Sequence, residues 1–223
     1  MKMVCLLLSC YPMIWGSECE AIFTEKWAFK TWGGVSLSGT GSDLIQTAAI
    51  RTAIPSLLQK YHCKTMVDAP CGDYYWMKMV NHQLDKYIGI DIVLPLVLTN
   101  QINYGDHQHV FIHMDIINEI IPKADLVLCR DCLGHFSDEE IAKTIRNFKK
   151  SGSTYLLTTS FTQHHSNINS TIGTGSWRPL DLRQSPYFFP EPLEISNENC
   201  TEDNNDWSDK SLFLWKIQDL PNL

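Results

Sequence analysis

The stretch VDAPCGD, residues 67–73, decides the fold that we expect for this chain. Residues 64–68, which lead into it, are of the kind that forms buried strands, and Pro70 and Gly72 mark a tight turn. Residues 74–82 behind the turn have a helical pattern. The order strand, loop and helix is the place where an open α/β sheet binds a nucleotide-like ligand.

Further apolar runs predict that this arrangement continues along the chain. Strands are expected at residues 86–91, 110–115, 124–129 and 154–159, each a near-continuous apolar run. Such runs are typical of strands that are buried on both faces in a parallel sheet. The segments 193–195 and 211–217 predict a closing antiparallel pair. The expected fold class is therefore α/β, with a mainly parallel sheet and a C-terminal antiparallel pair.

Two amphipathic patterns predict helices that cover this sheet. The run from Asp43 to Leu58 predicts a helix with Ser42 or Asp43 as its N-cap. A second helix is expected to begin after Ser137, because Ser137 and Glu140 have the spacing of a capping box.

Length and charge limit the number of domains and the class of partner. With 223 residues, the chain is long enough for one well-buried α/β domain, which we place at residues 20–223. The formal net charge of −7 argues against nucleic-acid binding, because contacts with phosphates need clustered Lys and Arg. The oligomeric state is left open.

Residues 1–19 have the features of a secretory signal peptide, with Lys2 before an apolar run and small residues behind it. The run is too short to span a bilayer. The alternative is a hydrophobic N-terminal extension that packs on the domain. The first interpretation favours the secretory pathway, and the second favours a cytoplasmic protein.

Residues 31–42 form a loop rich in glycine and hydroxyl groups. Trp32 within this loop favours a flap that closes over a pocket, with a flexible linker as the alternative. The irregular stretch 160–192 is interpreted as a loop on the substrate side.

Three acidic residues, Asp68, Asp91 and Asp115, follow successive predicted strands. The carboxyl ends of parallel strands form the ligand-binding edge of an open sheet. Asp91 lies 19 residues after Gly72, close to the offset of about 20 residues at which an acid binds ribose hydroxyls. The phosphate-cradling glycines of dinucleotide-binding proteins are missing, with Gly72 alone in the turn. A phosphate-free nucleoside therefore suits this loop better than a pyrophosphate does, which argues against a dehydrogenase.

Together these motifs resemble those of the class I S-adenosylmethionine-dependent methyltransferases, which have a Rossmann-like fold. Residues 67–73 resemble the first motif of the family, 88–91 its ribose-binding segment, 113–116 its adenine-side segment and 124–135 the segment that lines the methyl-transfer site. Within the family, the chain is similar to small-molecule or sugar methyltransferases of bacterial and viral type.

The resemblance implies S-adenosylmethionine as the cofactor and methyl transfer to a small-molecule or glycan acceptor, with a hydroxyl as the expected target. The cofactor contacts that we expect are Trp32, Gly33, Asp68, Pro70, Gly72, Asp73, Asp91, Ile92, Asp115, Ile116 and Arg130. The alternative is an inactive relative that keeps the fold and serves as a binding or scaffold module.

A hydroxyl acceptor needs a base, and His135 or Asp131 is best placed for this, because both follow the end of the predicted strand at residues 124–129. The structural alternative for His135 is a histidine that only binds backbone. The alternatives for Asp131 are to cap the turn, to hold Arg130 or to bind a divalent ion. Trp177 and Arg178 are expected to bind an anionic or sugar acceptor by stacking and paired hydrogen bonds, although Arg178 would serve equally well to anchor the long loop.

The spacing of Cys129, Cys132 and His135 resembles that of zinc ligands, but a fourth ligand is missing. We expect no metal. The positions of these cysteines at strand ends also argue against a disulfide framework.

Overall fold

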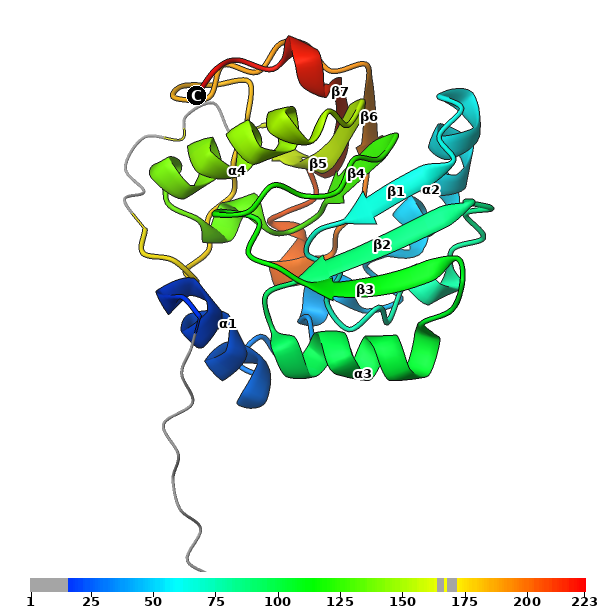
Figure 1. Ribbon diagram of the computed structural model, residues 1–223. Coiled ribbons are helices and arrows are strands. Elements are labelled where there is room, and N and C mark those ends of the chain that lie inside the picture. Colours follow the sequence, from blue (N-terminus) through cyan, green and yellow to red (C-terminus); the bar gives the residue numbers. More distant parts are fainter. Residues whose placement is uncertain (1–15, 164–166, 168–171) are drawn as a thin grey trace, which may run out of the picture.

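The computed structural model describes residues 16–163, 167 and 172–223. A seven-stranded sheet in the order β3-β2-β1-β4-β5-β7-β6 forms its centre (Figure 1). The strands are β1 (Thr65–Asp68), β2 (Lys86–Asp91), β3 (His109–His113), β4 (Leu126–Cys129), β5 (Tyr155–Phe161), β6 (Glu194–Asn197) and β7 (Lys210–Lys216). Strands β1 to β5 are parallel, and β7 runs antiparallel between β5 and β6. The predicted fold class is confirmed.

The α-helices of the described residues are α1 (Glu18–Ala28), α2 (Ala48–Lys60), α3 (Leu94–Tyr104) and α4 (Asp138–Ser151). Neighbouring residues of one strand enter different cores, because side chains of a strand alternate between the two faces of a sheet. Val127 lies in the core that contains the apolar side chains of α4, whereas Leu126 and Leu128 lie in the core that contains those of α2. The two helices therefore cover opposite faces of the sheet (Figure 1).

The start of α4 follows the prediction. The Ser137 side chain accepts a hydrogen bond from the Glu140 N–H, and the Glu140 carboxylate accepts one from the Ser137 N–H at 2.8 Å. Gly152, with φ of 71°, ends the helix in the left-handed conformation that favours glycine.

The start of α2 differs from the prediction. The helix begins at Ala48 rather than near Asp43, and Thr47 is its N-cap residue. The Asp43 side chain accepts hydrogen bonds from the backbone N–H groups of Val35 and Ser36, both at 2.9 Å. Asp43 therefore stabilises the preceding loop instead of the helix.

The helix expected at residues 74–82 is also wrong, since this segment has only a 3-10 turn at Met77–Met79. Tyr74 has a φ of 56°, which no α-helix tolerates, and its ring lies 5.0 Å from that of Tyr87 and 5.2 Å from that of Phe111. Burial of this aromatic ring among others determines the backbone here, at the expense of helical geometry.

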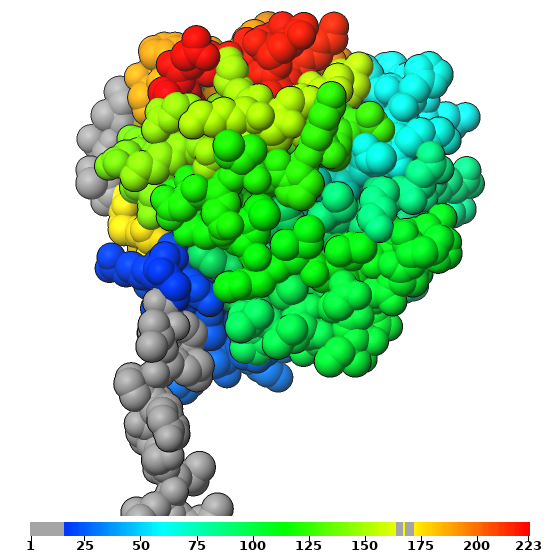
Figure 2. All heavy atoms as spheres, in the orientation of Figure 1, coloured from blue at the N-terminus to red at the C-terminus, as the bar shows by residue number. Residues whose placement is uncertain are grey.

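Helix α1 has no counterpart among the predicted elements, and it lies beside the carboxyl ends of β2 and β3 (Figure 1). Its residues rest directly on the body of the domain in the space-filling view of Figure 2. Two contacts hold its start there, from the Ser17 hydroxyl to Asp115 at 3.3 Å and from Glu20 to His113 at 3.1 Å. Residues 1–15 of the predicted signal segment lie outside the described residues, so that interpretation stays a prediction.

Among the described residues, no helix has the length and apolar character needed to cross a membrane.

Candidate active site

A cavity of about 480 Å³ opens at the carboxyl ends of the parallel strands. Most of the predicted site residues line it, namely Trp32, Asp68, Pro70, Gly72, Asp91, Ile92, Asp115, Ile116, Arg130, Asp131, His135 and Trp177. Gly33, Asp73 and Arg178 do not. Segments that lie far apart in the sequence, from Cys19 to Lys210, contribute to its wall.

Two buried carboxyl groups, Asp68 and Asp91, lie at the ends of β1 and β2. Asp68 accepts a hydrogen bond from the Tyr87 hydroxyl at 2.7 Å, and Asp91 accepts one each from the Gly72 and Val93 N–H groups at 3.0 Å. Burial raises the pKa of Asp68 to about 7 and that of Asp91 to about 6. Neither forms an ion pair with a cation of the described chain, so a cationic ligand would be stabilised beside them.

Gly72 brings the backbone of the turn close to the neighbouring loop. Its φ is 54°, and a Cβ at this position would lie 2.1 Å from the Ser38 hydroxyl oxygen. Any other residue would be strained and would push the loop aside. The single glycine of the motif therefore has a structural reason.

Asp115 follows β3 and is already engaged by protein groups. It accepts hydrogen bonds from the Ile117 N–H at 2.9 Å, the Asn118 side chain at 2.8 Å and the Ser17 hydroxyl at 3.3 Å. These contacts fix the carboxylate at the cavity wall next to α1.

The glycine-rich loop forms another wall through Trp32 and residues 37–42. Asp73 holds this loop, because its carboxylate accepts hydrogen bonds from the Leu37 N–H at 2.7 Å and the Ser36 hydroxyl at 2.9 Å. The structure thus places Asp73 behind the loop rather than in the cavity. Its contacts support a role in positioning the wall.

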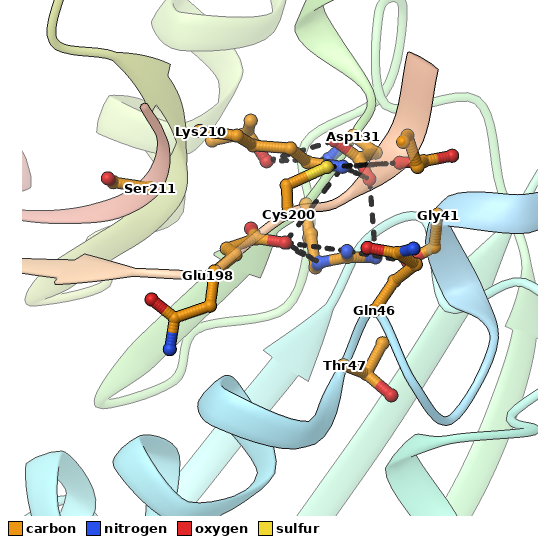
Figure 3. Close-up of polar contacts among 12 residues, drawn as sticks. Gly41, Gln46, Thr47, Asp131, Glu198, Cys200, Lys210 and Ser211 are labelled. Atoms are coloured by element: carbon orange, nitrogen blue, oxygen red, sulfur yellow. Dashed lines mark hydrogen bonds and ion pairs between the residues drawn. The ribbon is translucent and has the colours of Figure 1, made fainter. Parts of the chain in front are cut away.

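A buried ion network lies on the side of the cavity formed by β4 and β7 (Figure 3). Arg130 donates to Glu198 with Nη2 at 2.7 Å and Nε at 3.1 Å, and Nη2 also donates to the Gly41 carbonyl at 2.7 Å. Lys210 contacts Asp131 at 2.6 Å and Glu202 at 3.7 Å. Arg130 was expected to contact the cofactor, yet each nitrogen of its side chain has a protein partner, since Nη1 lies 3.2 Å from Asp131.

The same network decides the charge of Asp131. Burial alone would raise the pKa of Asp131, but Arg130 and Lys210 hold it at about 2. A carboxylate with so low a pKa is a weak base, and its Oδ2 is already bound to Lys210. This geometry favours the structural alternative for Asp131.

His135 has the features of a neutral base. Its Nδ1 lies 2.7 Å from the Ser176 carbonyl oxygen, which can only accept, so Nδ1 carries the proton and Nε2 keeps its lone pair. Burial lowers the pKa of His135 below its usual value. The ring packs near Phe23 and Trp32, with centroids 6.2 and 6.1 Å away.

The two residues expected to bind the acceptor lie in different environments. Trp177 lines the cavity and is 40% exposed. Arg178 is buried, and its Nη2 donates to Asp138 at 2.6 Å, to the Tyr187 hydroxyl at 3.1 Å and to the Phe136 carbonyl at 3.1 Å. These contacts support the anchoring alternative for Arg178.

The cysteine spacing does not correspond to a metal site in the described part of the chain, where no group of three or more His, Cys, Asp or Glu side chains is placed to hold an ion. Cys129 and Cys132 are buried free thiols. Burial raises the pKa of Cys132 well above its usual value, so this thiol stays protonated.

Several cavity residues were not foreseen from the sequence. They are Cys19, Phe23, Lys26 and Trp27 of α1, Trp76, and the set Glu202, Asp203, Trp207 and Lys210 near the C-terminus. A charged residue at the start of an apolar strand, as Lys210 is, was the one signal that could have pointed to a buried ion pair.

Comparisons with known proteins agree with this geometry at the level of the fold. A scan against protein-family models found no match, and a search of curated protein sequences found none either. Solved structures do match. Human N-acetylserotonin methyltransferase in complex with S-adenosylmethionine is 13% identical with a TM-score of 0.60, over 90% of this chain and 60% of that one.

Two further structures are matched over most of both chains. Magnesium protoporphyrin IX methyltransferase from Synechocystis PCC 6803, with bound S-adenosylhomocysteine, is 13% identical with a TM-score of 0.58, over 89% of this chain and 99% of that one. A Burkholderia thailandensis 1,6-didemethyltoxoflavin-N1-methyltransferase is 11% identical with a TM-score of 0.55, over 88% of this chain and 87% of that one. The chain therefore has the fold of the class I S-adenosylmethionine-dependent methyltransferases.

Proposed function

We propose that this protein transfers a methyl group from S-adenosylmethionine to a hydroxyl of a small-molecule or glycan acceptor. The observation that carries the proposal is the pair of buried carboxyl groups, Asp68 and Asp91, at the ligand-binding edge of the sheet. Both face the cavity without a cationic partner among the described residues. A ligand with an ammonium group, a sulfonium and ribose hydroxyls supplies the charges and donors that these carboxylates lack.

The turn at Gly72 also fits such a ligand. Asp91 holds the Gly72 N–H at 3.0 Å, which brings the turn and the end of β2 to one point of the wall. A nucleoside without phosphates can lie against this point, because it needs close backbone approach but no row of N–H groups to cradle a pyrophosphate. Neighbouring apolar side chains, Ile92 and Ile116 among them, would contact the adenine ring.

The bound cofactor would supply an electrophilic methyl group on its sulfonium. His135 would accept the proton of the acceptor hydroxyl through Nε2, with its tautomer fixed by the Ser176 carbonyl. Arg130 and Lys210 keep Asp131 ionised and hold this part of the cavity wall in place. A rigid wall would help to orient the acceptor and the cofactor for methyl transfer.

Calorimetric titration tests the cofactor claim directly. Folded protein should bind both S-adenosylmethionine and S-adenosylhomocysteine, and absence of binding would refute the proposal. Incubation with S-adenosylmethionine and a metabolite and glycan extract, followed by mass spectrometry, should reveal a product heavier by one CH₂ group. Cofactor binding without any methylated product would support the alternative of a binding module.

A further inference from the structure

The segment between β6 and β7 forms part of the cavity wall through Glu202, Asp203 and Trp207. Its backbone is unusual, because Asp203, Asn204 and Asn205 all have positive φ values of 47°, 59° and 70°. Asp and Asn are the side-chain-bearing residues that adopt this conformation most readily. The Asp-Asn-Asn sequence therefore allows a turn that returns Trp207 to the cavity, and strained turns of this kind concentrate at functional sites.

Contacts with the glycine-rich loop and with Gln46, just before α2, fix this turn in place. The Thr40 hydroxyl donates to Glu202 at 2.6 Å. Gln46 and Thr201 form two hydrogen bonds, from the Gln46 amide to the Thr201 hydroxyl at 2.9 Å and from the Thr201 N–H to the Gln46 oxygen at 3.0 Å. The turn is thus preorganised relative to the rest of the wall.

Two indole rings and one carboxylate meet on this part of the wall. The Trp177 and Trp207 rings lie edge to face with centroids 4.7 Å apart, and the Trp207 Nε1–H donates to Asp203 Oδ2 at 2.6 Å. Trp177 is 40% exposed, so part of its ring is open to a ligand. We call Trp177, Trp207 and Asp203 the indole–carboxylate subsite.

The charges around the subsite favour a cation over an anion. Arg130 and Lys210 are the basic groups on this wall, and both are already paired with acidic groups. Lys26 also lines the cavity, but it belongs to α1 and lies 5.9 Å from the centre of the Trp32 ring. Asp203 has no cationic partner in the part of the chain that the structure describes, and its Oδ1 accepts no hydrogen bond there.

We propose that the indole–carboxylate subsite binds a cationic ammonium group of the acceptor, while the acceptor hydroxyl meets His135. An ammonium group is attracted to the face of an indole and to a carboxylate that no other cation neutralises. The negative charge of the whole chain would also attract such a molecule. This inference rests on the proposed function, and it narrows the acceptor class to amine-bearing alcohols or amino sugars. Acceptors whose only charged group is a phosphate or a carboxylate do not fit the subsite.

Choline and its uncharged isostere 3,3-dimethylbutan-1-ol are suitable probes, because they share size and hydroxyl group but differ in charge. Calorimetry with protein saturated with S-adenosylhomocysteine should show choline binding about tenfold more tightly than the isostere, the difference expected for one cation–π contact with a nearby carboxylate. Equal affinities for the two probes would overturn the inference.

Asp203→Asn and Trp177→Leu should each remove most of the preference for choline. Asp206→Asn is the matched control, because Asp206 is an exposed acid of the same turn that does not line the cavity, and this change alters the net charge equally. Loss of the preference in Asp206→Asn as well would point to overall charge and contradict the subsite. Binding of S-adenosylhomocysteine, measured first, separates failure of this inference from failure of the proposed function.

Discussion

Asp91 accepts a hydrogen bond from the Gly72 N–H at 3.0 Å, although 19 residues separate the two in the chain. The contact joins the end of β2 to the turn after β1, and it lies on the cavity wall. The carboxylate therefore shapes the turn and also offers its remaining lone pairs to a ligand.

Asp91→Asn should weaken binding of S-adenosylhomocysteine by about 1.5 to 3 kcal/mol, the usual contribution of a hydrogen bond to a charged group. The amide keeps the size of the side chain and an oxygen for the Gly72 N–H, but its NH2 group then faces the Val93 N–H, so some stability should be lost as well. Calorimetry measures the affinity, and thermal unfolding without ligand checks the fold. An unchanged affinity in a folded variant would show that Asp91 does not contact the ribose.

The sequence was sufficient to place Asp68, Asp91 and Gly72 at one edge of the sheet, because the determinants of their positions are local. Strand-end acids and the turn glycine follow apolar runs, and parallel strands bring their carboxyl ends to one edge. The rest of the site depends on tertiary contacts. Lys210 meets Asp131 across 79 residues, and neither belongs to a motif that predicts the other.

The elements that were mispredicted have a similar cause. Tyr74 satisfies a helical pattern, yet its φ is 56° and its ring is buried among other aromatic rings. Asp43 has the composition of an N-cap but binds the N–H groups of Val35 and Ser36. In each case a contact with another segment outweighs local propensity, which contributes only about 1 kcal/mol per residue.

Cofactor binding should release protons near neutral pH. The folded-state pKa of Asp68, about 7, lies above the value of 3.8 expected for an exposed aspartate, so much of this carboxyl is protonated in the free protein at pH 6.5. A cationic ligand favours the ionised form, hence the proton leaves on binding and affinity rises as pH increases from 6 to 8. Calorimetry at pH 6.5 in two buffers of different ionisation enthalpy measures the released protons. Proton uptake, or affinity that falls with pH, would contradict this assignment.

Asp68 should also reduce the stability of the ligand-free protein at high pH. Because the pKa of Asp68 is raised in the folded state, the folded state binds this proton more tightly than the unfolded state does. The stabilising contribution of the protonated Asp68 is therefore fully present below pH 3.8 and is lost as pH rises through about 7. The amide of Asp68→Asn cannot ionise. The free energy of unfolding of Asp68→Asn relative to wild type should therefore increase between pH 5 and pH 8, as urea unfolding at both pH values would measure. A constant difference would show that Asp68 does not titrate in this range.

Arg130→Met should destabilise the protein by about 3 to 5 kcal/mol, because it leaves Glu198 buried without its main partner. Urea unfolding measures the loss as a lower midpoint at an unchanged slope. Lys216→Met is a suitable control, since Lys216 lies exposed at the other end of β7 from Lys210. If Arg130→Met lowered the free energy of unfolding by less than about 1 kcal/mol, the Arg130–Glu198 ion pair would contribute no more than an exposed surface pair does.

His135→Gln should lower the methyl-transfer rate by about 10² to 10⁴ fold, the usual contribution of a general base, without weakening cofactor binding. The tautomer can be checked without an acceptor, because ¹⁵N NMR of the wild-type ring should show a protonated Nδ1 and an unprotonated Nε2 at pH 7. Burial lowers the pKa of His135, so the base is neutral at pH 7, and kcat/KM should fall only when pH drops below that lowered value.

Asp131→Asn distinguishes His135 from Asp131 as the candidate base. Asp131 is ionised at every pH above 5, so the effect of Asp131→Asn on kcat/KM should be the same throughout that range. If His135→Gln kept full activity and its pH profile, the role of His135 would reduce to its hydrogen bond with Ser176.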